Sequence, residues 1–229
     1  MKTNKEKIIK TELVFILDKS GSMAGLESDT IGGYNAMLKK QQEAPGTVKV
    51  TTVLFDDGYE VLHDRLDIQR ITPITESEYY VGGCTALLDA IGKTINKIAN
   101  AQRHTQKEHR SDQVIFVITT DGLENASREY SDKQIKQLIE QQKNRDQWEF
   151  IFLGANIDAI ETAARFGISA DRAANYHADG AGTRLNYKVV SDAVCEMRAC
   201  NAVPTNWKDE IERDYQRREK KLGKSTSRS

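Results

Sequence analysis

Three short polar segments of the chain carry two aspartates and several hydroxyl side chains, of which we single out those of Ser20, Ser22 and Thr85. They are the sequences DKSGS at 18–22, GGCT at 82–85 and TDG at 120–122. Carboxylate and hydroxyl oxygens suit a hard cation such as Mg²⁺, Mn²⁺ or Ca²⁺, and they do not suit Zn²⁺. The candidate metal ligands are therefore the five oxygen-bearing side chains Asp18, Ser20, Ser22, Thr85 and Asp121.

Neutral hydroxyl ligands leave a bound cation with much of its positive charge, especially if the aspartates act partly through water. Mg²⁺ takes six oxygens at ~2.0–2.1 Å and keeps some water where a protein supplies few ligands. An ion held in this way has an open position that attracts a carboxylate from outside. We expect Mg²⁺ at this site, with Mn²⁺ or Ca²⁺ as alternatives, and recognition of an acidic group as its chemistry.

The elements around these segments place them at one edge of a sheet. Apolar residues over 11–17 lead into the first segment, and a strand that is apolar at nearly every position is expected over 114–120, before Asp121. The second segment opens a helical pattern over 85–101. Because functional residues gather beyond the carboxyl ends of parallel strands, the three segments are expected to meet there. Gly21 lets the backbone bend so that both serine hydroxyls can face one point.

The rest of the chain alternates strand-length apolar runs with helical patterns. Further helices are predicted over 26–43, from the capping box Ser131–Gln134 onward, and over 157–166 and 182–202. Further strands are predicted over 48–55, 59–63, 148–153 and 173–177. The order of elements predicts a three-layer α/β/α, Rossmann-like open sheet, mostly parallel, with helices on both faces.

The strands 48–55 and 59–63 read as a hairpin, which would supply one antiparallel edge strand. Asp56, Asp57 and Gly58 form its turn, and Gly58 is expected to have a positive φ.

Length and composition favour one large domain with a charged appendage. The chain has 229 residues, of which 38% are hydrophobic, enough for one core. We expect a domain over 1–205 and a charged helix and tail over 206–229. A net charge of -1 makes no general electrostatic case for nucleic acid or for an anionic membrane.

The tail itself leaves two interpretations open. From Arg213 onward there are seven basic and two acidic residues. A solvated helix with a disordered end is the favoured interpretation, because charge runs are common at chain ends. The alternative is a basic arm that binds nucleic acid or a partner.

Cysteine usage and the apolar runs predict a cytoplasmic location. The three cysteines, Cys84, Cys195 and Cys200, form no C-x-x-C pair, which favours a reducing compartment. The first ten residues are basic without an apolar stretch, so no secretory signal is predicted. The apolar runs are strand-sized and too short to cross a bilayer.

The five candidate ligands resemble a known motif. Asp18-x-Ser20-x-Ser22, then Thr85, then Asp121 within TDG, are similar to the metal-ion-dependent adhesion site (MIDAS) of the von Willebrand factor type A (VWA) domain. All five positions match, and the order of elements agrees over about residues 11–200. The surrounding sequences, VFILDKSGSM and VIFVITTDGLENAS among them, look most like stand-alone bacterial or phage members of that family.

The resemblance implies a fold and a function. In that family the hydroxyls contact the ion, the aspartates bind it directly or through water, and an Asp or Glu of a protein partner completes the coordination. It implies a sheet of about six strands with one antiparallel edge. For this chain it implies a metal-dependent protein-binding module without enzymatic activity.

Two alternatives stand beside this interpretation. Each motif residue taken singly is also explained by local turn or cap chemistry. The enzyme alternative is a Mg²⁺-dependent phosphatase or phosphotransferase on a similar scaffold. The commonest such motif begins Asp-x-Asp, where this chain has Ser20, and no Walker-type glycine loop is present.

The sequence also predicts roles for a few other polar residues and for one cysteine. Glu124 and Asn125 are either supports of the site or ordinary loop residues, and Asp89 is expected to be structural. Cys84 is expected to be a small buried packing residue. The four histidines are scattered and form no metal-like pair.

Overall fold

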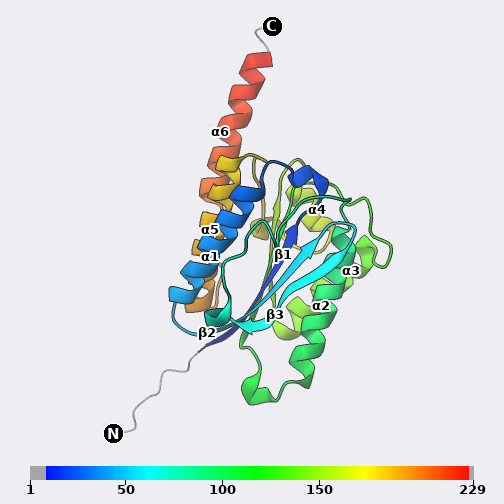
Figure 1. Cartoon of the computed structure of the whole chain (residues 1–229), viewed down its shortest axis with the longest axis vertical. Helices are drawn as coiled ribbons and strands as arrows, with labels where there is room; N and C mark the ends of the chain where they lie inside the picture. Colours follow the sequence, from blue (N-terminus) through cyan, green and yellow to red (C-terminus); the bar gives the residue numbers. More distant parts are fainter. Residues whose placement is uncertain (1–8, 227–229) are drawn as a thin grey trace.

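The computed structural model describes residues 9–226 and places one six-stranded sheet at the centre of the molecule (Figure 1). The strand order is β3-β2-β1-β4-β5-β6. The strands are β1 (Lys10–Asp18), β2 (Thr47–Phe55), β3 (Tyr59–Asp67), β4 (Gln113–Thr120), β5 (Glu149–Gly154) and β6 (Ala173–Asn175). All neighbouring pairs are parallel except β2 and β3, so the predicted mostly parallel sheet with one antiparallel edge strand is confirmed.

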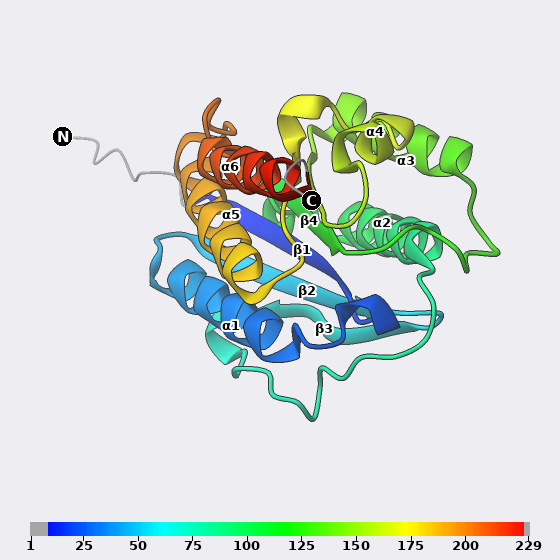
Figure 2. The same cartoon turned by 90° about the horizontal axis from the view of Figure 1, so that it is seen from above.

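Helices cover both faces of the sheet, as Figure 2 shows from above. On one face lie α1 (Glu27–Glu43), α5 (Gly180–Cys200) and α6 (Asp209–Thr226). On the other lie α2 (Leu87–His104), α3 (Asp132–Asp146) and α4 (Ala159–Arg165). No helix in the described part of the chain is both apolar and long enough to cross a membrane.

Alternation along β1 explains why its sequence is almost continuously apolar. Leu13 and Phe15 are fully buried in the core under α1 and α5, whereas Val14 and Ile16 are fully buried in the core under α2 and α3. A central parallel strand is covered on both faces, so both sets of alternating side chains must be apolar.

The hairpin between β2 and β3 forms as predicted, but the conformation predicted for its glycine is wrong. Gly58 does not have a positive φ. Instead the Asp56 carboxylate accepts a hydrogen bond from the Gly58 N–H at 2.6 Å, which closes the turn locally. The turn is therefore closed by the Asp56 side chain and not by a left-handed glycine backbone.

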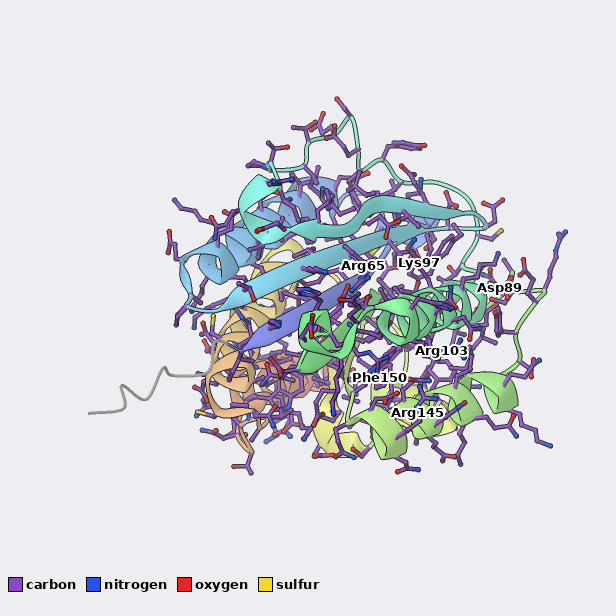
Figure 3. All side chains as sticks on the ribbon, turned by 90° about the horizontal axis from the view of Figure 1, so that it is seen from below. Arg65, Asp89, Lys97, Arg103, Arg145 and Phe150 are labelled. Carbon is purple, nitrogen blue, oxygen red and sulfur yellow. The ribbon has the colours of Figure 1, made fainter. Side chains whose placement is uncertain are left out.

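A buried ion pair joins β1 to the C-terminal half of β3. The Glu12 side chain is 0% exposed and receives Nε and a terminal NH₂ of Arg65, each at 2.9 Å. Gln102 of α2 and Ser111 add hydrogen bonds at 3.0 and 3.2 Å. Figure 3 labels Arg65 beside the strands. Arg65 has φ 51, and the pairing of β2 with β3 shifts register near Thr52.

The segment after α5 packs on the domain instead of leaving it at once. Trp207 and Ile211 are buried in the core under α1 and α5, and the Trp207 indole N–H donates to the Asp171 carbonyl at 2.8 Å. Lys208 Nζ donates to the Ala173 carbonyl at the free side of β6 at 3.0 Å. Farther along, α6 extends past the body of the molecule at the top of Figure 1. The domain boundary near 205 stays a prediction.

Replacement of Trp207 tests how firmly this segment belongs to the domain. We expect Trp207→Phe to lower the free energy of unfolding by about 1–2 kcal/mol, because it removes one buried hydrogen bond and leaves a small cavity. Urea denaturation measures the change. Arg217→Ala, on the exposed side of α6, is the matched control and should stay within about 0.5 kcal/mol of wild type. Equal stability of both variants would contradict the packing role.

Candidate metal site

Four of the five predicted ligands form one connected cluster at the carboxyl ends of β1 and β4. The hydroxyl oxygens of Ser20 and Ser22 are 3.1 Å apart, and the Ser22 hydroxyl donates to Asp121 Oδ1 at 2.5 Å. Asp18 Oδ1 accepts the Ser20 backbone N–H at 2.7 Å. Side chains 18–22 and 121, about a hundred residues apart in the chain, therefore meet as the sequence predicted.

Thr85 borders the same cluster through Gly122. A Cβ placed on Gly122 would lie 3.1 Å from Ser22 Oγ and 3.4 Å from Thr85 Oγ1, so both hydroxyls face this glycine. The predicted start of the helix at Thr85 is wrong, because α2 begins at Leu87 and Ala86 is its N-cap. Thr85 lies in the preceding loop, so its hydroxyl is not used as a helix cap.

Backbone hydrogen bonds join the first segment, 18–22, to the second, 82–85. Gly21 N–H donates to the Gly83 carbonyl at 3.1 Å, and Gly82 N–H donates to the Lys19 carbonyl at 2.9 Å. Gly83 has φ +71, and a Cβ there would collide with Asp57. Only glycine combines that backbone conformation with so close an approach. The glycine pair before Cys84 therefore positions Thr85.

Three residues that were not predicted as ligands also shape the site: Thr120 and Tyr79 support Asp18, and Gly122 leaves space beside the hydroxyls of Ser22 and Thr85. Thr120 Oγ1 donates to Asp18 Oδ2 at 2.6 Å, and the Tyr79 hydroxyl donates to the Asp18 carbonyl at 2.5 Å. Tyr79 is 1% exposed although it lies in a loop. Thr120 could have been noticed because it directly precedes Asp121 at the end of an apolar strand. Gly122 could have been noticed for the space it leaves beside the hydroxyls.

The loop after Asp121 is held by its own side chains. Asn125 Oδ1 accepts the Thr85 N–H at 2.9 Å. Glu124 accepts the N–H groups of Leu88, Ala126 and Ser127 and the Ser127 hydroxyl. Both residues therefore support the site structurally. Asp89 is structural as predicted, since it accepts three backbone N–H groups from residues 128–130 at the N-terminal end of α2 (Figure 3). Cys84 is exposed, so its predicted burial is wrong.

Burial disfavours the charged forms of the two aspartates, Asp18 and Asp121. Burial raises the pKa of Asp18, although hydrogen bonds from Ser20 and Thr120 oppose this. Burial also raises the pKa of Asp121; the Ser22 hydrogen bond opposes this, and the nearby charge of Asp18 adds to it. Asp121 Oδ2 is buried and has no hydrogen-bond partner within residues 9–226. A buried carboxylate oxygen without a partner is unfavourable unless a cation or a proton compensates it.

The donor set fits a divalent cation. It holds two carboxylates and three hydroxyls, the unpartnered Asp121 Oδ2 is one free ligand, and Ser22 is exposed while the other four residues are buried. The cluster therefore opens to solvent on its Ser22 side. Within residues 9–226, no group of three or more His, Cys, Asp and Glu side chains is placed to hold a metal ion, so a cation at this cluster would depend on the hydroxyls as well as the two carboxylates.

Replacement of Gly122 tests the geometry of the hydroxyl pair. We expect Gly122→Ala to weaken Mg²⁺ binding about tenfold, because the new methyl group would press on Ser22 Oγ and Thr85 Oγ1. Isothermal titration calorimetry measures the affinity. Gly32→Ala in α1 is the matched control, since nothing lies within 4 Å of its new methyl group, and it should leave the affinity unchanged. Unchanged affinity in both variants would show that Gly122 does not border the ion.

Comparison with known proteins gives likenesses in structure only. No protein-family model matches the chain, and no curated protein matches it. Proximal thread matrix protein 1 of the mussel byssus superposes with a TM-score of 0.53 at 13% identity, over 82% of this chain and 46% of its own. This chain thus spans about half the length of the mussel protein. Another structure of that protein has a zinc-occupied MIDAS motif.

Two further structures come from other organisms. The manganese-loaded TRAP protein of Plasmodium vivax has a TM-score of 0.56 at 17% identity, over 77% of this chain and 72% of its own. The pilus adhesin SpaC of Lactobacillus rhamnosus GG, in an open conformation, has a TM-score of 0.62 at 12% identity, over 83% of this chain and 30% of its own. With the observed sheet order, these likenesses show that the chain has a VWA-like three-layer α/β/α fold.

Proposed function

We propose that the chain is a metal-dependent protein-binding module. Asp18, Ser20, Ser22, Thr85 and Asp121 would hold one divalent cation, for which we favour Mg²⁺, and a partner's Asp or Glu carboxylate would complete its coordination. The observation that carries this proposal is the buried Asp121 Oδ2, which has no hydrogen-bond partner among the described residues. A cation there offsets the charge of both aspartates and, when bound, attracts an outside acid.

Some of these side chains would hold the ion in place, and others would leave it accessible to a partner. Asp18 is fixed by Ser20 N–H and Thr120 Oγ1, so its charge is present at the site in one orientation. The exposed Ser22 marks the side from which a partner can approach. Three hydroxyls add no negative charge, which leaves the cation attractive to a carboxylate.

The structural neighbours support the same proposal through the metals that two of them hold and the adhesive role of a third. One mussel structure holds zinc at its MIDAS motif, TRAP is loaded with manganese, and SpaC is a pilus adhesin. We carry over only divalent-metal binding and adhesion to a partner. A cytoplasmic, bacterial or phage setting, without membrane or nucleic acid as the ligand, remains part of our proposal.

The phosphatase alternative finds less support in the geometry. A phosphoryl-transfer enzyme of that kind needs a free carboxylate nucleophile beside the ion. Asp18, the aspartate that ends β1, has both carboxylate oxygens engaged in hydrogen bonds at 2.6 and 2.7 Å. The neighbouring Lys19 amine is directed to Glu60 at 3.0 Å, away from a phosphate at the site.

Selection from a displayed peptide library tests the proposal. Two libraries of random heptapeptides are used, one with Glu and one with Gln fixed at the central position. We expect wild-type protein in Mg²⁺ to enrich the Glu library and EDTA to release it. Asp121→Asn protein should enrich neither library. Equal enrichment of both libraries, or retention in EDTA, would refute metal-dependent recognition of an acid.

A further inference from the structure

Large apolar side chains are exposed on both sides of the candidate metal site. In the described part of the chain four such side chains are exposed: Leu66, Tyr80, Leu123 and Ile160. Tyr80 is 58% exposed and Leu123 is 63% exposed, which makes them the two most exposed of the four. Both belong to the loops that carry Thr85 and Asp121. Single exposed apolar residues are ordinary, but two beside one polar site call for an explanation.

Leu123 is presented by a fixed loop. Its neighbour Gly122 faces the hydroxyls of Ser22 and Thr85, and its other neighbour Glu124 accepts four hydrogen bonds from α2 and the following loop. The backbone on both sides of Leu123 is therefore immobilised. Its exposure is a consequence of fixed backbone positions, so the side chain is available to a partner without prior rearrangement.

Tyr80 is presented in a similar way on the other side. Its neighbour Tyr79 donates a hydrogen bond to the Asp18 carbonyl, and Gly82 donates to the Lys19 carbonyl. The Lys19 ammonium group lies 4.3 Å from the centroid of the Tyr80 ring, within the range of a cation–π contact. Lys19 also pairs with Glu60 of β3. The Tyr80 ring is thus oriented by the buried Lys19, whose positive charge is already paired with Glu60.

The two side chains belong to loops that adjoin different neighbours of β1 in the sheet. Tyr80 contacts Lys19, which reaches Glu60 on the β2–β3 side of β1. Leu123 follows β4, which is the neighbour of β1 on the other side. A peptide that places an acid at the Ser22 opening and runs across the sheet therefore passes both loops, and each offers one exposed apolar side chain.

We propose that Tyr80 and Leu123 determine specificity, so that the partner offers an acidic residue flanked on both sides by apolar side chains. This inference rests on the proposed function. The carboxylate alone would be shared by every Asp or Glu on a protein surface and selects nothing. Apolar contacts at both flanks add both affinity and selection, because tyrosine is enriched among the residues that contribute most to binding and burial of a leucine side chain adds hydrophobic free energy.

The same library with fixed central Glu tests the inference, read position by position. We expect wild-type protein in Mg²⁺ to enrich apolar residues at positions flanking the Glu. Peptides from that selection should bind Tyr80→Ser and Leu123→Ser each about tenfold more weakly, as measured by fluorescence anisotropy. The matched control is Leu66→Ser, whose side chain is 41% exposed at the far end of β3. It should bind like wild type.

The outcomes separate the inference from the proposed function. EDTA-sensitive enrichment of Glu peptides with random flanks would overturn the inference and leave the proposed function standing. No preference for Glu over Gln would overturn both. Mg²⁺ must still raise the thermal midpoint of Tyr80→Ser and Leu123→Ser, which separates a lost contact from a damaged site. Self-association, or binding to phosphatidylcholine vesicles, that both variants abolish would assign the pair to another occupant and overturn the inference.

Discussion

Addition of Mg²⁺ to metal-free protein is expected to raise its Tm by about 5–10 °C at a concentration one hundred times the Kd. A ligand at that concentration stabilises the folded state by about 2.7 kcal/mol, and each kcal/mol shifts Tm by about 2–4 °C in a domain of this size. The physical reason is the buried pair of aspartates, one oxygen of which has no partner. Differential scanning calorimetry over a series of Mg²⁺ concentrations measures the shift.

The Asp121→Asn variant tests whether the rise in Tm with Mg²⁺ depends on the negative charge of Asp121 and not on a change in the fold. Without metal we expect the variant to be at least as stable as wild type, because it removes one of two neighbouring buried negative charges. With metal we expect no rise in Tm. Asp89→Asn is the matched control: it should be less stable in both conditions, because Asp89 accepts three backbone hydrogen bonds, yet keep the full response to Mg²⁺. A full response in Asp121→Asn would refute the metal site.

Arg65→Ala is expected to lower the free energy of unfolding by about 3–5 kcal/mol. The substitution leaves the Glu12 carboxylate buried without its cation, and an uncompensated buried charge is among the most destabilising changes in a protein. Gln102 and Ser111 still donate to Glu12, but two neutral donors do not replace a bidentate guanidinium. Chemical denaturation at neutral pH measures the change.

The double variant Glu12→Gln/Arg65→Ala shows whether charge or packing is responsible. We expect it to recover much of the stability lost in Arg65→Ala, because a neutral amide does not require a counter-ion. Lys97→Ala removes an exposed ion pair with Asp64 and serves as a control, expected within about 1 kcal/mol of wild type. A double variant as unstable as Arg65→Ala would attribute the loss to packing of the arginine side chain.

The sequence predicts the architecture well because the sheet is covered on both faces. Strands such as β4 are buried along their whole length, so their apolar runs stand out clearly from the amphipathic helices. The pattern also located α1 despite Gly32 and Gly33. The structure explains Gly33, because a Cβ there would collide with the ring of Tyr187 on α5. A glycine that weakens a helix locally is retained here for close packing.

Within the site, the sequence predicts ligand types but not their supports. Asp18, Ser20 and Ser22 are close in sequence, and strand order brings Asp121 to them. The hydrogen bond from Tyr79 to the Asp18 carbonyl joins residues 61 positions apart, and no spacing rule indicates it. The start of α2 differs from the prediction for a similar reason: the Thr85 carbonyl accepts the N–H groups of Asn125 and Ala126 instead of the Asp89 N–H, which donates to the Ser127 hydroxyl. Long-range side-chain partners of this kind override local helix signals.

The two outer strands of the sheet have a consequence for how this protein can meet others. Exposed strand edges invite pairing with another chain, and proteins block them with irregular backbone and charged side chains. On β6 the Lys208 amine occupies the Ala173 carbonyl, and on β3 the left-handed Arg65 and the shifted register interrupt a regular ladder. Both edges are therefore poor templates for strand addition, which favours the proposed recognition of partners by side chains at the carboxyl end of the sheet.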